Sequence, residues 1–249
     1  MSDRSQAERK RIVIVGAVAA GTSAAAKARR NDESADIVLY ERDEHISYSG
    51  CGLPYYIGGR VADLQTLTPR DPAFFQEKYN VTIRIRHQVL GIDPEKKTLV
   101  VRDLTDHSEF TDHYDVLILA TGASAVVPPI PGVDRPHVFT LRNPLSARAI
   151  RDFIKTRRPR SAAIIGSGFI GLEMVENLAL AGLKVTLIEK LPQLCPFVDP
   201  DMAPYLEQHL AEHQISVLTD RTVTAIEADA VHMATGETVA ADLVILAVG

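Results

Sequence analysis

The sequence has little cysteine: only Cys51 and Cys195 occur among its 249 residues. Two cysteines do not make the disulfide framework of a small secreted domain, so any thiol chemistry depends on a single cysteine or on a partner's. No apolar run approaches the roughly 20 residues that span a bilayer, and residues 1–11 lack the apolar region of a secretory signal. We therefore expect a protein of the reducing cytoplasm without a membrane segment.

Blocks of Lys or Arg are also absent, and the net charge is −5. An acidic balance without a basic face argues against nucleic acid as a partner. What the sequence does have is 46% hydrophobic and 24% charged residues, which is the composition of a soluble globular protein. The length allows one large domain or two of ordinary size.

Two stretches, residues 11–41 and 161–189, follow the same plan. Each contains an apolar strand, a glycine turn, a helix rich in Ala or Leu and a second β-branched strand. The strands show no alternation of polar and apolar residues, as expected for parallel strands covered on both faces. The sequence therefore predicts an α/β fold with two Rossmann-like βαβ units and two nucleotide sites.

The material between these units predicts smaller elements. A short helix should end near Lys78, and the proline-rich segment 126–136 should be an ordered connector. Strands are expected over residues 81–85, 88–92 and 98–103, and a fully buried strand over 114–120. We expect a domain of residues 1–157 and a second of 158–249. Residues 242–249 repeat the pattern of 115–122 and stop directly after a strand, so we expect a fragment of a longer chain.

The first glycine turn runs from Gly16 to Gly21 and departs from G-x-G-x-x-G, because Val18 holds the place of the middle glycine. Such a turn aims a helix N-terminus at a pyrophosphate. The acidic residue expected about 20 positions later, which binds a ribose diol, is Glu41.

The second turn, with Gly166, Gly168 and Gly171, fits the pattern in full, and Glu189 ends the next strand. A carboxylate suits a free ribose 2′-hydroxyl and repels a 2′-phosphate, so NADH is favoured over NADPH. The adjacent Lys190 weakens that preference.

Cys51 follows the first unit and has small neighbours in Ser49, Gly50 and Gly52, which leave its sulfur accessible. A helix that begins near Cys51 would favour the thiolate. The segment alone fits a buried structural cysteine equally well. For Cys195, in a proline-flanked loop, we expect the structural role.

Taken together, two dinucleotide units, the ATG of residues 120–122 and a cysteine after the first acidic strand end resemble the pyridine nucleotide–disulfide oxidoreductases. Most members carry C-x4-C, whereas Cys51 is followed by GLPYY. The sequence thus resembles the single-cysteine branch, which contains coenzyme A (CoA)-disulfide reductases, CoA-persulfide reductases, NADH oxidases and NADH peroxidases. The resemblance implies a glutathione-reductase-like fold that uses FAD with NADH or NADPH. It also implies a C-terminal dimerisation domain, which we expect to lie outside this sequence, and a homodimer at full length.

The first turn discriminates within the branch. Oxidases and peroxidases place a histidine where this chain has Ala19, so the turn GAVAAG resembles the CoA-disulfide reductases. The resemblance implies catalytic roles for Cys51 and Glu173, and no metal. It implies contacts to FAD or NAD(P)H for Gly16, Ala17, Gly21, Glu41, Arg42, Val89, Thr121, Gly122, Gly166, Gly168, Gly171 and Glu189. It implies contacts to CoA for Ser23, Lys27, Arg30, Ser47 and Lys78.

Three other functions remain open from the sequence. An NADH oxidase or peroxidase would use a Cys51 sulfenate. A truncated flavin-binding protein would transfer electrons or sense redox state without CoA turnover. A monooxygenase-like or ferredoxin-reductase-like flavoprotein would share both nucleotide units and give Cys51 no role.

Overall fold

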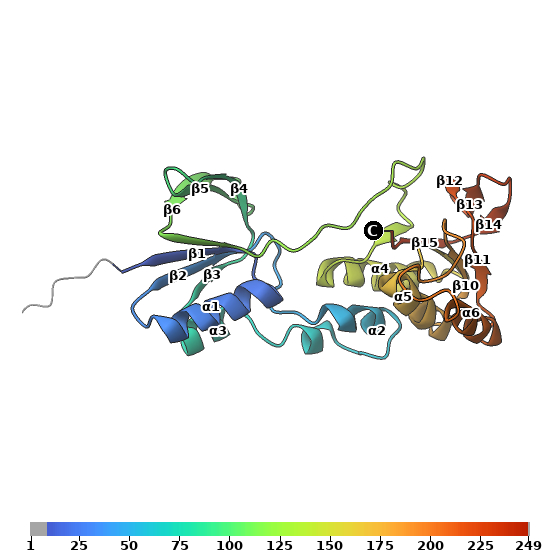
Figure 1. Ribbon diagram of the computed structural model, residues 1–249, viewed down its shortest axis with the longest axis horizontal. Coiled ribbons are helices and arrows are strands. Elements are labelled where there is room, and N and C mark those ends of the chain that lie inside the picture. Colours follow the sequence, from blue (N-terminus) through green and yellow to red (C-terminus); the bar gives the residue numbers. More distant parts are fainter. Residues whose placement is uncertain (1–8, 249) are drawn as a thin grey trace, which may run out of the picture. The chain divides into compact units, whose positions relative to one another are not determined.

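The computed structural model describes residues 9–248 (Figure 1). Its contacts divide the chain into two compact units. The first contains the described residues up to Ser49 together with Gln65–Ala123, and the second contains Gly50–Leu64 together with the described residues from Ser124 onward. The expected boundary near residue 157 does not coincide with this division, because the cysteine segment and residues 124–157 pack in the second unit.

The first unit contains a four-stranded parallel sheet with the order β3-β2-β1-β7 among its described residues. Its strands are β1 (Arg11–Val15), β2 (Asp36–Tyr40), β3 (Thr82–Arg84) and β7 (Val116–Leu119). Figure 1 shows the helices α1 (Ala19–Asn31) and α3 (Pro72–Tyr79) on one face of this sheet. The other face carries an antiparallel meander of β4 (His87–Asp93), β5 (Thr98–Asp103) and β6 (Glu109–His113).

Alternate residues of β1 enter two different cores. Ile12 and Ile14 pack with Ala25 of α1 and Phe75 of α3. Val13, which points to the opposite face, packs in the cluster that contains the meander residues Leu99 and Val101. Both faces of the strand are therefore buried, which explains why its sequence is apolar without alternation.

The second unit repeats this plan with a five-stranded parallel sheet, in the order β11-β10-β9-β15-β8 among the described residues. Its strands are β8 (Val138–Thr140), β9 (Ser161–Ile165), β10 (Lys184–Ile188), β11 (Ser216–Leu218) and β15 (Leu243–Leu246). A second meander consists of β12 (Val223–Ile226), β13 (Ala230–Met233) and β14 (Thr238–Ala240). The helices are α2 (Leu53–Ile57), α4 (Pro144–Arg157), α5 (Phe169–Leu180) and α6 (Ala203–Glu212).

The predicted elements between the two units are confirmed with small shifts in their ends. Helix α3 ends at Tyr79, and the expected strands correspond to β3, β4 and β5. The connector 126–136 has no regular secondary structure, but the N–H of Ile226 donates to the carbonyl of Pro131 at 2.8 Å and so ties its latter part to β12. None of the described helices is long and apolar enough to cross a membrane.

One prediction of burial is wrong. Residues 114–120 were expected to form a fully buried strand, but β7 is an edge strand, and Leu119 is 61% exposed. The equivalent strand of the second unit, β15, lies between β9 and β8 and is buried along its whole length. The two strands have similar sequences, so their different burial follows from their neighbours in the sheet.

Candidate functional site

The first glycine turn depends on close backbone contacts. Gly16 has φ +100°, and a Cβ on it would lie 2.2 Å from the carbonyl oxygen of Ala120. A Cβ on Gly21 would lie 1.8 Å from the carbonyl oxygen of Gly16. Only glycine fits at either position. The turn therefore places the N-terminus of α1, which begins at Ala19, directly after β1.

Glu41 braces this turn from the end of β2. Its side chain is buried, and its two carboxylate oxygens accept hydrogen bonds from the N–H of Ala17 at 2.8 Å and the N–H of Asp43 at 3.0 Å. The predicted ribose-binding carboxylate is thus fixed beside the glycine turn by the backbone. Arg42, the next residue, is exposed.

The second turn repeats the close contacts and adds an open position. A Cβ on Gly166, where φ is +104°, would lie 2.7 Å from the carbonyl oxygen of Ala247, and one on Gly171 would lie 2.0 Å from that of Gly166. A Cβ on Gly168 would meet nothing within 4 Å. The corresponding position of the first turn is filled by Val18. Open space at the N-terminus of α5 allows a diphosphate to approach the backbone, so these residues fit a dinucleotide.

Glu189 receives three hydrogen bonds at the second turn. They come from the N–H of Ser167 at 2.8 Å, the hydroxyl of Ser167 at 2.7 Å and the N–H of Leu191 at 2.9 Å. Burial alone would raise the pKa of this carboxyl, but the hydrogen bonds from Leu191 and Ser167 outweigh burial and hold the pKa below its usual value. Glu189 is therefore ionised at neutral pH.

Cys195 belongs to the same hydrogen-bond network. Its N–H donates to the hydroxyl oxygen of Ser167 at 3.1 Å, and its thiol donates to the carbonyl oxygen of Ser167 at 3.3 Å. The side chain is 2% exposed, and burial together with the charge of Glu189 raises the pKa of the thiol. A buried, protonated thiol is a poor nucleophile, in agreement with the structural role expected for Cys195.

Cys51 has the opposite surroundings. It is exposed and lies in a short 3₁₀ turn, Gly50–Gly52, directly before α2. Tyr56 takes the place of the second cysteine of a C-x4-C pattern and is buried. The guanidinium carbon of Arg151 lies over its ring, 4.2 Å from the ring centroid. Within residues 9–248, Cys51 is thus the one exposed thiol.

Three contacts fix the segment after Cys51 to helices of the second unit. A Cβ on Gly58 would lie 2.8 Å from the side-chain oxygen of Asn177, so α2 and α5 approach closely there. Arg151 of α4 donates to the carbonyl oxygens of Val61 and Ala62 at 3.2 and 3.0 Å. The guanidinium of Arg60 pairs with Glu176 at 3.0 Å. Cys51 is therefore held in the same compact unit as the second glycine turn.

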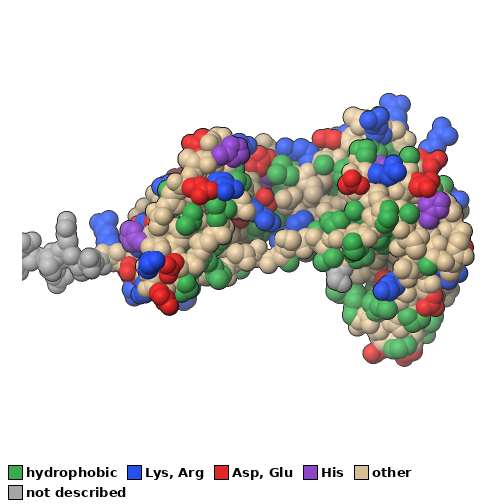
Figure 2. All heavy atoms as spheres, turned by 90° about the horizontal axis from the view of Figure 1, so that it is seen from above, with side chains coloured by type: hydrophobic (Ala, Val, Ile, Leu, Met, Phe, Trp, Pro, Cys, Tyr) green, Lys and Arg blue, Asp and Glu red, His purple; other side chains and the backbone are tan. Residues whose placement is uncertain are grey.

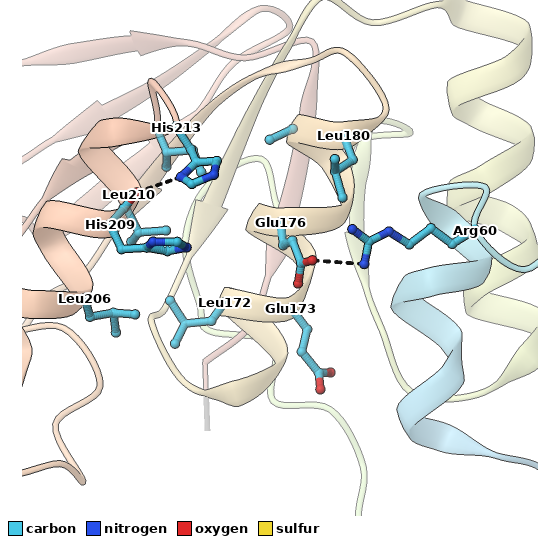
Figure 3. A pocket seen from close by; sticks show the side chains of 11 residues that line it. Arg60, Leu172, Glu173, Glu176, Leu180, Leu206, His209, Leu210 and His213 are labelled. Carbon is cyan, nitrogen blue, oxygen red and sulfur yellow. Dashed lines mark hydrogen bonds and ion pairs between the residues drawn. The ribbon is translucent and has the colours of Figure 1, made fainter.

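Glu173 lines a cavity of about 480 Å³ between α5 and α6 (Figure 3). Figure 3 shows Arg60 reaching Glu176 on one side of α5, while His209 of α6 and His213, which directly follows α6, lie on its other side. Burial, and then the charge of Glu176, raise the pKa of Glu173 above its usual value. The carboxyl thus has the partly buried setting of an acid–base group.

The residues predicted to bind CoA lie in the first unit. Ser23, Lys27 and Arg30 are exposed and share one face of α1, because their spacing of four and three residues matches the helical repeat. Lys78 is exposed on α3, and Arg29 joins the end of α3 to α1 by donating to the carbonyls of Tyr79 and Asn80. The N–H of Ser47 donates to the carbonyl of Ala17, next to the first turn.

The remaining predicted FAD contacts also lie in the first unit. Thr121 and Gly122 follow β7, and Gly122 has φ +65°. Val89 is half-buried in β4, where the pairing with β5 shifts register between Val89 and Gly91. Such a bulge changes the direction of the backbone groups beside it. Among the described residues, no three His, Cys, Asp or Glu side chains form a group that could hold a metal ion.

Sequence reasoning missed two residues that position the site. Ser167 stands at a variable position of G-x-G-x-x-G, yet its hydroxyl joins Glu189 to the backbone of Cys195. Gly58 allows the contact with Asn177 that fixes the cysteine segment. The sequence signal for Ser167 is that a residue with a hydroxyl side chain stands where the first turn has Ala17. The glycine pair at residues 58 and 59 gave a weaker signal for a close approach.

The comparison with known proteins agrees with this geometry. The profile of the family described as "Pyridine nucleotide-disulphide oxidoreductase" matches residues 10–249. The chain belongs to this family. A coenzyme A disulfide reductase from Staphylococcus haemolyticus is 33% identical over 240 residues, which are 96% of this chain and 54% of the relative. This member of the family thus spans about half the length of the curated relatives that it matches.

Solved structures of the same fold include several oxidoreductases. Reduced CoADR-RHD from Bacillus anthracis has a TM-score of 0.95 at 40% identity, covering 97% of this chain and 44% of that chain. An NAD-dependent persulfide reductase from A. fulgidus has a TM-score of 0.92 at 34% identity, covering 96% and 46%. A water-forming NADH oxidase from Lactobacillus brevis, bound to NADH, has a TM-score of 0.91 at 32% identity, covering 96% and 54%.

Proposed function

We propose that this chain is the nucleotide-binding part of an FAD-dependent NADH oxidoreductase that reduces CoA disulfide or a CoA persulfide through Cys51. The observation that carries the proposal is the exposed Cys51, without a second cysteine in its segment, fixed to the unit that contains the complete glycine turn. Relatives named coenzyme A disulfide reductase and persulfide reductase support the choice of acceptor.

The two units would hold different cofactors. We assign FAD to the first unit, at Gly16, Ala17, Gly21, Glu41, Arg42, Val89, Thr121 and Gly122. We assign NADH to the second, at Gly166, Gly168, Gly171 and Glu189. The ionised Glu189 favours a free 2′-hydroxyl over a 2′-phosphate, which supports NADH. When bound, NADH and FAD supply the hydride and the electron pair that reduce the disulfide.

The chain's own chemical step is thiol–disulfide exchange. The Cys51 thiolate attacks one sulfur of CoA disulfide, the Cys51–CoA S–S bond forms, the CoA–CoA S–S bond breaks and one CoA thiolate leaves. Two electrons and a proton then release the second CoA thiol and restore the Cys51 thiolate. In this proposal Lys27, Arg30 and Lys78 bind CoA phosphates by charge, and Ser23 and Ser47 add hydroxyl contacts. Glu173 would hold or release a proton near the nicotinamide.

The mixed disulfide gives the sharpest test. The chain is reduced, freed of reductant and incubated with CoA disulfide, and then its intact mass and the released CoA thiol are measured. We expect one CoA adduct and one released thiol per chain, with the adduct removed by dithiothreitol. Cys51→Ser should form no adduct, and Cys195→Ala, which removes the buried thiol, should form it normally. An adduct on Cys51→Ser, or none on the unmodified chain, would refute the proposal.

The alternative acceptors predict other results. An NADH oxidase or peroxidase, supported by the Lactobacillus brevis structure, would form an oxygen-sized adduct on Cys51 with hydrogen peroxide and no CoA adduct. Ala19, in place of the histidine of that branch, argues against it. Retained FAD without NADH consumption that depends on CoA disulfide would indicate an electron-transfer or sensing role. A homodimer and a cytoplasmic location remain predictions.

A further inference from the structure

A basic cavity of about 670 Å³ lies in the second unit, at the edge where the strands β8, β9 and β15 begin. Its lining includes His137, which precedes β8, Arg160, which precedes β9, and Asp242, which precedes β15. The second glycine turn follows the carboxyl end of β9, at the opposite edge of the same sheet. The cavity is therefore separate from the predicted NADH site.

The charges around this cavity are unbalanced. The lining contains a single carboxylate, Asp242, and four arginines, which are Arg135, Arg157, Arg158 and Arg160. One carboxylate oxygen of Asp242 accepts hydrogen bonds from the N–H of Arg160 at 2.7 Å and the N–H of Ser161 at 3.0 Å, so backbone donors already engage this oxygen. In the part of the chain that the structure describes, the guanidinium groups of Arg157 and Arg158 form no ion pair. The cavity thus presents a positive charge excess to a ligand.

Three of its side chains make this cavity more than an arginine-rich surface. The Nε of Arg135 donates to the carbonyl of Ile226 at 3.0 Å, which fixes that guanidinium in place. His137 also lines the cavity and is 7% exposed; its side chain has a hydrogen bond with the backbone of Glu227, while its buried Nε2 has no partner among the described residues. Phe153 adds an aromatic side chain to the lining.

We infer that this cavity binds a small phosphate-bearing anion of nucleotide size, independently of the NADH site. Arginine guanidinium groups bind phosphate oxygens in a bidentate way, and clusters of them are a common phosphate-recognition device. A volume of about 670 Å³ is in the range of small-molecule sites. The proposal goes beyond the proposed function, because it needs neither Cys51 nor the glycine turns.

Inorganic pyrophosphate is a suitable probe, titrated calorimetrically into the purified chain at low ionic strength. Arg157→Gln/Arg160→Gln should weaken binding about tenfold or more, since two charge-assisted contacts are lost. The matched pair Lys155→Gln/Lys96→Gln removes the same charge outside the cavity and should leave the affinity within about twofold. Both arginines are exposed, so the fold should persist, as circular dichroism would check.

Three outcomes would overturn the inference. One is the absence of pyrophosphate binding to the unmodified chain. Another is an equal loss in the two double variants, which would indicate general charge attraction. The last is retained binding in Arg157→Gln/Arg160→Gln together with its loss in Gly168→Val, which would place the anion at the second glycine turn.

Discussion

The two βαβ units share one backbone plan and differ in a few side chains. The N–H of Gly16 donates to the carbonyl of Tyr40, and the N–H of Gly166 donates to the carbonyl of Ile188, both at 2.8 Å. In the same way, the N–H of Ala120 donates to the carbonyl of Val15 and the N–H of Ala247 to the carbonyl of Ile165, again at 2.8 Å. Basic residues are mixed with acidic ones over both units on the face in Figure 2, so no field of one sign distinguishes them there. The shared framework is set by backbone contacts.

The differences lie at the middle of each turn. Val18 fills the position that Gly168 leaves open, and Ala17 stands where Ser167 supplies a hydroxyl to Glu189. Both carboxylates, Glu41 and Glu189, accept the equivalent N–H at 2.8 Å. The comparison teaches that the glycines bordering each turn are required by the fold, whereas the middle position is free to determine how a ligand approaches.

The largest expected effect separates these two kinds of glycine. Gly171→Ala places a Cβ 2.0 Å from the carbonyl oxygen of Gly166, and the backbone must move. We expect a loss of about 3 kcal/mol in the free energy of unfolding, the upper range for overpacking. Urea denaturation followed by circular dichroism measures it. Gly168→Ala is the matched control: Gly168 is the N-cap of α5, where Ala is less favourable than Gly, and the loss should be less than about 1 kcal/mol. Equal losses of unfolding free energy in the two variants would contradict the distinction between the bordering glycine and the middle glycine.

A second prediction concerns Glu189 and pH. Glu189→Gln removes a buried carboxylate with three hydrogen bonds and should lower the unfolding free energy by about 2 kcal/mol at pH 7. Because the folded pKa lies below the usual value, this stabilisation is full above about pH 4.3 and is lost as the pH falls through the folded pKa.

Urea midpoints measured from pH 7 to pH 3 check this prediction. The difference between the unmodified chain and Glu189→Gln should shrink toward pH 3. The exposed Glu212 provides the control, and Glu212→Gln should change little at any pH. A difference that stays constant with pH would contradict the assignment of an ionised Glu189.

The smallest expected effect comes from Ser167→Ala, which gives the second turn the side chain of the first. The hydroxyl donates to Glu189 and accepts from the N–H of Cys195, so its loss should cost about 1 kcal/mol. Hydrogen exchange at the amide of Cys195 should become faster, because that N–H loses its acceptor. Unchanged exchange would show that the hydroxyl does not hold the Cys195 loop.

The glycine turns, both acidic strand ends and most strands were predictable, because spacing and apolar runs specify them locally. The burial of residues 114–120 was not predictable, since it depends on the neighbours of the strand in the sheet: β7 is at an edge, whereas the similar strand β15 is flanked on both sides. The compact units also divide the chain differently from the expected boundary at residue 157. Contacts between distant residues, such as Gly58 with Asn177, join the cysteine segment to the second unit, and no local pattern reveals them.

The most direct test of the account is the affinity of the chain for NADH, compared between the unmodified protein and Gly168→Val. The variant gives the second turn the valine that the first turn has at Val18. A Cβ at residue 168 would meet nothing within 4 Å, so the unfolding free energy should change little. We expect NADH binding, measured by calorimetry, to weaken at least about tenfold, because the valine side chain occupies the path of the pyrophosphate. Unchanged affinity in a folded variant would contradict the assignment of NADH to the second turn.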